Sequence, residues 1–341
     1  MSTEWTTFLA DAGFNAERGD FGDAAGELCA VRDAVVVAPL VDLGLIRASG
    51  PDAADFLHNL LTNDVTGVGA TTARFAGFCT AKGRLLATLL IWRDGDDLLL
   101  LLPKDIHAVI LKKLSMYILR SKVKLTDASE QFALIGFSCR GAVPPGLTFE
   151  TLSAIGEGQA GPACEGRGIG LEATRWLIAV PAESAGQCWN ALSSQARPVG
   201  LAAWQWLEIA AGKPRVVAAT QEAFVPQMLN MELPAVAGVS FTKGCYPGQE
   251  IVARTQYLGK VKRRMYRASL GVPIPPGTHV YAPESGDQHC GAIVSVAPSP
   301  AGGYEALVCA QSAAVEAGEV HVERIDGPPL GFLPLPYPLG A

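Results

Sequence analysis

Apolar positions recur along this chain in two patterns. Short runs rich in β-branched residues and bounded by turns predict strands, and apolar residues three or four positions apart predict helices. In the first half of the chain, strands are expected at residues 35–50, 74–80, 84–93, 98–102, 122–128 and 132–138, and helices at 51–61 and 104–119. This succession of strands and helices is typical of an α+β fold.

The second half of the chain begins with a segment of small residues and ends with a series of short predicted strands. Residues 144–170 are rich in Gly, Pro and small side chains, so an irregular segment is expected there. A strand at 173–181 and helices at 184–193 and 201–212 follow. Five short strands separated by Gly and Pro turns then predict a small β-barrel, at residues 262–270, 278–283, 290–298, 304–311 and 320–325. The Pro-rich tail at 327–341 is expected to be irregular.

Composition and charge narrow the class of protein. The chain has 341 residues, 49% of them hydrophobic, and a formal net charge of −6. A dedicated nucleic-acid-binding domain is usually basic, so there is no direct nucleic-acid-binding signal. Residues 1–20 lack the basic and apolar regions of a secretory signal, and the apolar runs are of strand length. We therefore expect a cytoplasmic protein without a membrane partner.

The eight cysteines and five histidines form no recognisable metal or redox motif. No two cysteines make a C-x-x-C pair, and no metal site is predicted. Cys79, Cys139 and Cys309 lie in apolar context and are expected to be buried and reduced. His58 falls on a predicted helix, where a surface or satisfied role is expected. Cys245 differs, because it lies in a polar, glycine-flanked stretch two residues after a lysine.

That stretch, "FTKGCYPGQEIVARTQYLGK" at 241–260, predicts a loop that presents side chains. Gly244, Pro247 and Gly248 disfavour a helix, and a core strand would not carry so many polar groups. The thiolate is the reactive form of cysteine, and the Lys243 ammonium would favour it at Cys245. Cys245 is thus a candidate redox partner, nucleophile or transient ligand, and the alternative is a cysteine that only packs the loop.

The string "KGCYPGQEIVAR" at 243–254 closely resembles the signature of the YgfZ family of folate-binding proteins, which are relatives of the aminomethyltransferase (T-protein) of glycine cleavage. Further similar blocks are found at residues 48–65, 79–93, 224–250 and 253–266. Together these blocks extend over most of the chain up to the predicted barrel.

The resemblance implies an α+β fold in three parts around a central folate cavity. These are a ferredoxin-like unit at 1–125, a second such unit at 126–258 that ends in the KGCYPGQE loop, and a β-barrel with the Pro-rich tail at 259–341. It also implies tetrahydrofolate, or a derivative, as the cofactor. The implied role is assembly or repair of iron–sulfur enzymes, including tRNA-modifying ones, so iron–sulfur enzymes or assembly proteins are the expected partners.

Folate needs an aromatic slot for its flat pterin and cations for its glutamate tail. Trp204 matches the family tryptophan that lines the slot, whereas Trp206 projects from another helical face; core packing is the alternative for Trp204. Between Lys243 and Arg267 the only acid is Glu250, which suggests a local positive field. The predicted cofactor-binding residues are Asp42, Leu43, Trp204, Tyr246, Gln249, Glu250 and Arg254, and the candidate reactive pair is Cys245 with Lys243. Tyr246, Gln249 and Glu250 are expected to hold the loop rather than to react, and Asp64 of the "TND" block to be a loop or cap residue.

One departure from the aminomethyltransferases bears on activity. Their acidic pair corresponds to Ala87 and Thr88 here, and a further acidic position corresponds to Ala210. These side chains supply no carboxylate and no general base, so the T-protein reaction is not expected. Glu208, Glu222 and Glu232 stay open as groups for the pterin edge.

Three hypotheses follow. The first is a folate-binding accessory factor for iron–sulfur enzymes that is not a classical enzyme. The second is a folate-dependent one-carbon transferase acting on protein or tRNA, with Cys245 as nucleophile. The third is a non-catalytic interaction scaffold. The missing carboxylates favour the first over the second, and the polar loop argues against the third.

Overall fold

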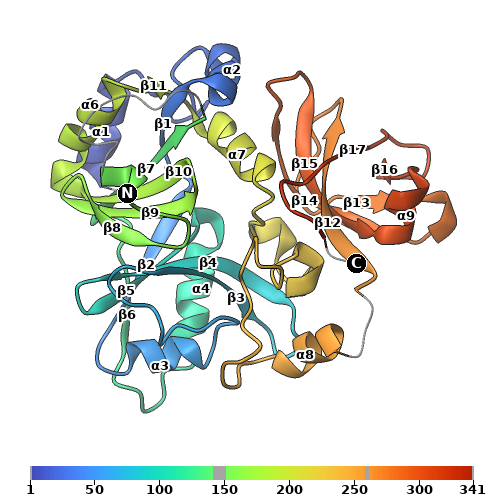
Figure 1. Ribbon diagram of the computed structural model, residues 1–341, viewed down its shortest axis with the longest axis horizontal. Coiled ribbons are helices and arrows are strands. Elements are labelled where there is room, and N and C mark those ends of the chain that lie inside the picture. The colour runs from blue at the N-terminus through green and yellow to red at the C-terminus, as the bar shows by residue number, and fades with distance from the viewer. Residues whose placement is uncertain (1, 141–150, 258–260, 340–341) are drawn as a thin grey trace. The chain divides into compact units, whose positions relative to one another are not determined.

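A computed structural model describes residues 2–140, 151–257 and 261–339, and its ribbon is shown in Figure 1. In these ranges the chain is mixed α+β with two six-stranded sheets and one five-stranded sheet, so the predicted α+β class is confirmed. Two compact units are formed, unit 1 by Met1–Phe56, Val65–Arg74 and Leu90–Trp204, and unit 2 by Leu57–Asp64, Phe75–Leu89 and Gln205–Ala341. The three-part division with boundaries after residues 125 and 258 stays a prediction.

The five-stranded sheet has the strand order β3-β4-β5-β2-β6. Its strands are β2 (Leu43–Ser49), β3 (Ala73–Cys79), β4 (Leu85–Asp94), β5 (Asp97–Pro103) and β6 (Lys124–Asp127), and the division between the units passes through β3 and β4. Helix α3 (Ala53–His58) follows β2, and helix α4 (Lys104–Ser115) packs on β2, β5 and β6. Helix α4 ends four residues before the predicted end, and Met116 and Leu119 beyond it are 72% and 87% exposed.

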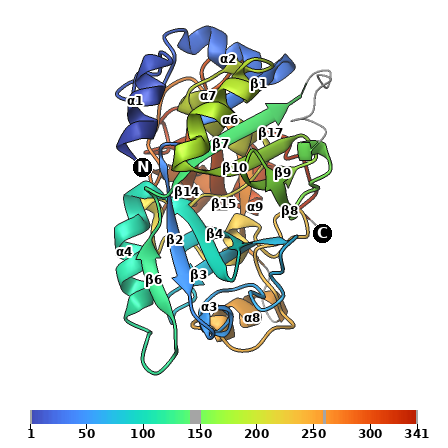
Figure 2. The same ribbon diagram turned by 90° about the vertical axis from the view of Figure 1, so that its left-hand side faces the viewer.

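A six-stranded sheet of unit 1 has the order β11-β1-β7-β10-β9-β8. The strands are β1 (Val35–Pro39), β7 (Phe132–Cys139), β8 (Ala160–Ala163), β9 (Gly166–Glu172), β10 (Arg175–Pro181) and β11 (Arg197–Pro198). Helices α1 (Thr3–Asp11) and α6 (Ala185–Ser193) pack against each other beside this sheet, as Figures 1 and 2 both show. The Trp5 and Trp189 rings meet edge to face with centroids 5.8 Å apart. Helices α1 and α2 (Ala24–Asp33) were not among the predicted elements.

The irregular segment predicted at 144–170 lies outside the described residues as far as residue 150, and the prediction was wrong for residues 160–170, which belong to the β8–β9 hairpin. Glycine commonly indicates a turn, but Gly168 and Gly170 lie inside strand β9. A Cβ on Gly170 would lie 2.1 Å from the Gly156 carbonyl oxygen, and one on Gly168 would lie 2.8 Å from Ile155. Glycine in this strand therefore permits a close approach of neighbouring chain rather than ending the strand.

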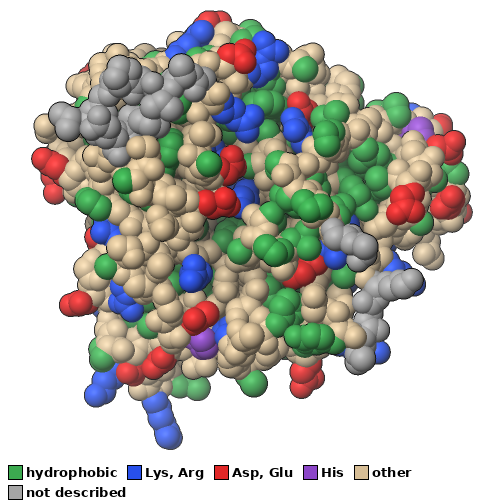
Figure 3. Space-filling view, viewed as in Figure 1, with side chains coloured by type: hydrophobic (Ala, Val, Ile, Leu, Met, Phe, Trp, Pro, Cys, Tyr) green, Lys and Arg blue, Asp and Glu red, His purple; other side chains and the backbone are tan. Residues whose placement is uncertain are grey.

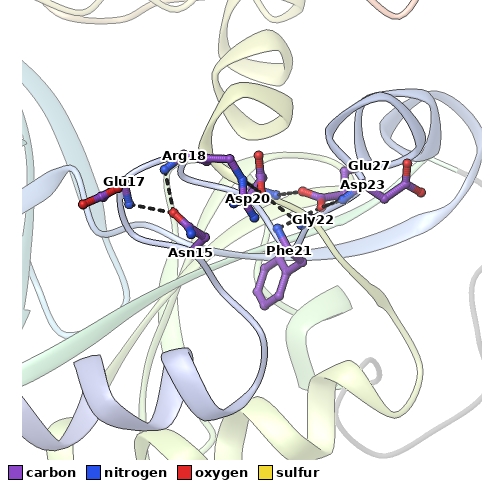
Figure 4. A network of polar contacts seen from close by, with 9 residues as sticks. Asn15, Glu17, Arg18, Asp20, Phe21, Gly22, Asp23 and Glu27 are labelled. Atoms are coloured by element: carbon purple, nitrogen blue, oxygen red, sulfur yellow. Dashed lines mark hydrogen bonds and ion pairs between the residues drawn. The ribbon is translucent and has the colours of Figure 1, made fainter.

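A buried carboxylate fixes the loop before α2 to the start of helix α7 (Leu201–Ala210). The Glu27 side chain accepts hydrogen bonds from the backbone N–H groups of Phe21 at 2.9 Å, Asp23 at 3.2 Å and Gly200 at 2.8 Å. Figure 4 shows this network together with the Asn15–Asp20 turn beside it. Because three donors share one carboxylate, the charge is compensated although Glu27 is buried. The network thus positions α7, the helix that carries Trp204.

The C-terminal sheet of unit 2 is a six-stranded half-barrel with the order β16-β13-β14-β15-β12-β17. Its strands are β12 (Arg263–Leu270), β13 (His279–Tyr281), β14 (Gly291–Pro298), β15 (Tyr304–Gln311), β16 (His321–Val322) and β17 (Gly331–Leu333), and α9 (Ser312–Ala317) follows β15. Buried Ala, Val, Ile and Leu side chains form its core. All five predicted strands are found. The tail is not wholly irregular, because β17 pairs with β12.

Short 3₁₀ helices complete the described chain, at Ala182–Ser184, Ala218–Thr220, Pro226–Leu229 and Pro283–Ser285. On the face seen in Figure 3, acidic and basic side chains are interspersed rather than gathered by sign. No helix within the described ranges has the length and apolar character that a membrane span requires.

Candidate functional site

The motif stretch combines a loop and a helix. Residues 241–248 are non-helical, as predicted, but the loop predicted for 241–260 was wrong for Gln249–Tyr257, which form helix α8 directly after Gly248. Residues 258–260 lie outside the described ranges. Gly248 has a φ of 82°, and a Cβ there would lie 2.5 Å from the Thr80 carbonyl oxygen and 2.6 Å from the Gly83 backbone. Only glycine allows this close approach, so the loop is docked on the turn that joins β3 to β4.

Lys243 is the anchor of the loop. Its Nζ donates hydrogen bonds to the carbonyl oxygens of His58 and Leu61, the second at 2.8 Å, where helix α3 ends. It also lies 4.8 Å from the centre of the Tyr246 ring. Carbonyls at a helix C-terminus lack partners within the helix and carry partial negative charge, so they suit an ammonium group.

The electrostatics of Lys243 tie it to two neighbours. Burial lowers the pKa of Lys243 from 10.5 to about 8, and the negative charges of Asp64 and Cys245 act in the opposite direction. Cys245 thus acts on the pKa of Lys243, and the predicted reactive pairing of the two side chains stays a prediction. Cys245 and Cys29 are exposed, and Cys79, Cys139 and Cys309 are buried as predicted.

Two side chains of the "TND" block bind the segment that precedes the loop. The Thr62 hydroxyl donates to the Gly238 carbonyl at 2.6 Å and accepts from the Gly77 N–H at 2.7 Å. The Asn63 amide donates to the carbonyls of Phe75 at 2.8 Å and Ala237 at 2.7 Å. These two side chains thus join strand β3 to the segment that leads into the motif.

His58 is the residue of this neighbourhood that sequence reasoning undervalued. Its Nδ1 lies 3.0 Å from the Asp64 Oδ1, and its side chain is only 17% exposed. Its Nε2 lies 3.9 Å from the position that a Cβ would take on Gly244, the residue before Cys245. The expectation of a satisfied histidine holds, but its partner and its place beside the motif were not foreseen. Asp64 is more than a cap, because its carboxylate contacts His58 and raises the pKa of Lys243.

The other motif residues divide by exposure. Tyr246 is 6% exposed, and burial, together with the nearby Cys79, raises the pKa of its hydroxyl. Gln249 is half-buried at the start of α8, and Glu250 and Arg254 are exposed on it. Tyr246 thus anchors the loop, and Glu250 and Arg254 are open to solvent.

The predicted local positive field needs a correction. Arg264 pairs with the buried Glu232, and Arg267 donates from Nε to Glu305 at 2.7 Å. These carboxylates come from distant parts of the sequence, so the run of bases is partly neutralised. Of the groups left open for a pterin edge, Glu208 pairs with Arg215 at 3.4 Å and Glu222 is exposed. Glu232 Oε2 is buried with no hydrogen-bond partner among the described residues.

The remaining predicted residues belong to unit 1. Asp42 and Leu43 are partly exposed at the start of β2, where the Asp42 carbonyl accepts from the Lys104 N–H at 2.9 Å. Trp204 is 2% exposed and packs on Gly136, where a Cβ would lie 2.6 Å from the indole. Core packing of Trp204 is thus real, whether or not it also meets a ligand.

Arg175 was missed by the sequence analysis. Its guanidinium lies 5.3 Å from the centre of the Trp204 ring and pairs with Glu172 at 2.8 Å. Arg175 Nε and Nη1 and Trp204 Nε1 are buried without a hydrogen-bond acceptor among the described residues. The available signal was a single base opening the apolar strand "RWLIAVP". Buried unpaired donors are rare in proteins, so this cluster suits a ligand with acceptor groups.

The positions of the missing acidic pair have structural roles here. Ala87 is fully buried, and the Thr88 hydroxyl accepts a hydrogen bond from the Val216 N–H at 3.1 Å. Ala210 is also buried.

The fold is that of the aminomethyltransferases. Residues 6–138 match the GCVT N-terminal domain family. The crystal structure of the glycine cleavage system aminomethyltransferase T from Bartonella henselae aligns with a TM-score of 0.75 at 18% sequence identity, covering 98% of this chain and 97% of that one. This likeness establishes the fold.

The family follows from closer relatives. The tRNA-modifying proteins YgfZ of Cronobacter sakazakii and Vibrio vulnificus are each 31% identical to this chain. The alignments cover 71% and 72% of this chain and 74% of each relative. The chain therefore belongs to the YgfZ family, as its motif had indicated.

Proposed function

We propose that this protein is a cytoplasmic, tetrahydrofolate-binding accessory factor that supports assembly or repair of iron–sulfur enzymes, including tRNA-modifying ones. The observation that carries the proposal is the Lys243–Cys245 loop. Its exposed thiol is held beside an ammonium group that is itself fixed by two backbone carbonyls. Membership of a family whose named relatives are tRNA-modifying proteins supports the link to tRNA.

Folate binding is supported by the chemistry of Trp204 and Arg175. The three unpaired buried donors suit a ligand that offers carbonyl, ring-nitrogen or carboxylate acceptors. The aminomethyltransferase fold adds to this inference, together with the resemblance of the motif to that of folate-binding proteins. Asp42 and Leu43, at the start of β2, remain proposed contributors.

Cys245 is the proposed reactive residue. An ammonium group near a thiol favours its thiolate form, and Cys245 is near enough to Lys243 to act on the pKa of that lysine. The His58–Asp64 pair adds a titratable imidazole beside Gly244. In this proposal the thiol acts as redox partner, nucleophile or transient ligand of the iron–sulfur client, and Tyr246, Gln249 and Glu250 shape the loop.

A one-carbon transferase is the weaker alternative. Ala87 and Ala210 are buried in apolar surroundings, and the Thr88 hydroxyl is engaged by a backbone N–H. No carboxylate stands at the three positions where aminomethyltransferases carry acids, so the folate would be bound without the base that its one-carbon chemistry needs.

The test is titration with a stable reduced folate, 5-formyltetrahydrofolate, followed by calorimetry and tryptophan fluorescence. Trp204→Phe should weaken binding roughly tenfold, or about 1.4 kcal/mol, because the indole N–H and part of the ring are lost. Trp206→Phe is the matched control on the same helix, and its affinity should stay within about twofold of wild type. Absence of binding at millimolar ligand would refute the folate role and leave the scaffold hypothesis.

A further inference from the structure

Two thiols outside the motif converge in unit 1. Strands β8 and β9 are joined by a two-residue turn, because Ala163 pairs with Gly166. The turn residues Cys164 and Glu165 both have left-handed backbones, with φ values of 48° and 62°. Turns of this kind favour Asn-Gly, so cysteine and glutamate adopt this geometry at some energetic cost.

The turn is tethered to the start of helix α6. The Glu165 carboxylate accepts a hydrogen bond at 2.7 Å from the hydroxyl of Ser184, the residue before the helix. Cys188 is buried in the first turn of the same helix. Cys164 and Cys188, together with Ser184 and Gln187, line an open pocket of about 270 Å³.

The two thiols interact directly and are not equivalent. A side-chain hydrogen bond with Cys188 lowers the pKa of the Cys164 thiol, although burial opposes this effect. The same bond, together with burial, raises the pKa of the Cys188 thiol. Cys164 is also the more exposed of the two. Cys164 is therefore the better nucleophile, and Cys188 holds its proton beside it.

We propose that Cys164 and Cys188 form a redox-active dithiol site that exchanges with small-molecule disulfides of the glutathione type entering this pocket. The Cys164 thiolate attacks one sulfur of the disulfide, forms a mixed disulfide and releases one thiolate. Cys188 then loses its proton and attacks the Cys164 sulfur, which forms the Cys164–Cys188 bond and releases the second thiolate. The two cysteine protons end on the two released thiols, the cysteines are oxidised by two electrons, and the small disulfide is reduced.

This site is separate from the motif and does not depend on the proposed function. Cys290 and Cys309 are the informative contrast, because Cys290 also raises the pKa of Cys309 yet both residues are buried. Burial raises the pKa of Cys309 to about 12, so that pair lacks an accessible thiolate. Intracellular disulfides in proteins are commonly transient and redox-sensing, which fits a bond between a strained turn and a helix.

The experiment uses the reduced full-length protein, exposed to excess oxidised glutathione, quenched with N-ethylmaleimide and digested for mass spectrometry. We expect a peptide pair linked through Cys164 and Cys188, and its reversal by reduced glutathione. Cys188→Ser should stop the reaction at Cys164 carrying one glutathione. Cys164→Ser should abolish the link.

Two controls keep the outcome interpretable. Cys29→Ser removes an exposed thiol of the same unit and should leave the link unchanged. Circular dichroism should show that each variant is folded. If a variant does not fold, the presence or absence of the Cys164–Cys188 link in the wild-type protein still tests the proposal. Wild-type protein that accumulates glutathione on Cys164 without the internal link, or in which both thiols stay fully alkylatable, would overturn the proposal.

Discussion

Lys243 combines two tasks that conflict energetically. As a donor to the carbonyls of His58 and Leu61 it holds the motif loop, and as a charge it is the proposed partner of Cys245. Both tasks require the ammonium form, yet the burial that fixes the side chain disfavours that form. The result is a lysine whose pKa of about 8 lies close to neutral pH. A small change in pH therefore alters the charge beside the thiol.

Lys243→Met should change the pH dependence of stability. The pKa of Lys243 is about 8 in the folded protein and 10.5 ordinarily, so between these values the unfolded chain binds more protons. Wild-type stability should therefore rise with pH across this window relative to the variant, and the relative penalty should be complete below it. Urea unfolding of both proteins at several pH values tests this, and a difference that stays constant with pH would contradict it.

Lys243→Ala should slow alkylation of Cys245. Loss of one nearby positive charge raises the energy of the thiolate by about 1 kcal/mol, or roughly fivefold in its population near neutral pH. The measurement is the iodoacetamide rate at each cysteine by mass spectrometry. Cys29, also exposed, is the matched control and should react at the same rate in both proteins. If Cys245 in the wild type reacts no faster than Cys29, the loop does not activate its thiol.

At the scale of elements, the motif loop connects the end of helix α3 with the turn between β3 and β4. Gly248 lies against the β3–β4 turn, and α8 begins at the next residue. Thr62 and Asn63 join strand β3 to the segment before the motif. The loop is thus fixed at both ends by backbone contacts, and its middle, at Gly244 and Cys245, is exposed.

Gly248→Ala should therefore destabilise the protein, whereas Gly244→Ala should not. At Gly248 an alanine meets a left-handed backbone and a carbonyl oxygen 2.5 Å from its Cβ, so the loss should exceed the roughly 1 kcal/mol of backbone strain alone. At Gly244 the nearest atom is His58 Nε2 at 3.9 Å, an ordinary contact. Chemical denaturation of the two variants compares them, and equal stability would show that the loop can undock without cost.

The elements that the sequence predicted best are those with uninterrupted apolar patterns, such as β4, β5 and β7. The β8–β9 hairpin was missed because its glycines permit close packing. In the sequence, such a glycine cannot be told apart from a glycine that forms a turn. The loop and its exposed cysteine could be predicted from Gly244, Pro247 and Gly248. The acceptors of Lys243 could not, because they are main-chain carbonyls at the end of α3 and in the turn after it, and a carbonyl has no signature in the sequence. The pairing of Arg264 with Glu232 was hidden for a related reason, since the partners meet only through the fold.

At the scale of the whole molecule, the cysteines separate by environment into different expected roles. All eight lie in the described ranges, and none of them is joined to another by a disulfide there. Burial raises the pKa of Cys79 to about 12, which keeps it protonated and inert. Cys164 and Cys188 share a pocket, and Cys245 stands exposed beside a cation. These environments predict a structural role for Cys79, an exchangeable one for Cys164 and Cys188, and a reactive one for Cys245.

Cys245→Ser should separate stability from function. Cys245 is exposed, so its serine variant should unfold at nearly the wild-type temperature and keep its folate affinity, yet fail to support iron–sulfur enzyme activity in cells that lack the native gene. Cys79→Ser buries a hydroxyl at a fully enclosed position and should cost about 1–3 kcal/mol while still supporting that activity at permissive temperature. Thermal unfolding and complementation of the two variants, side by side, measure both effects. If Cys245→Ser complements fully, the motif thiol is dispensable, and the role of the loop must lie in how Lys243 and Tyr246 hold it.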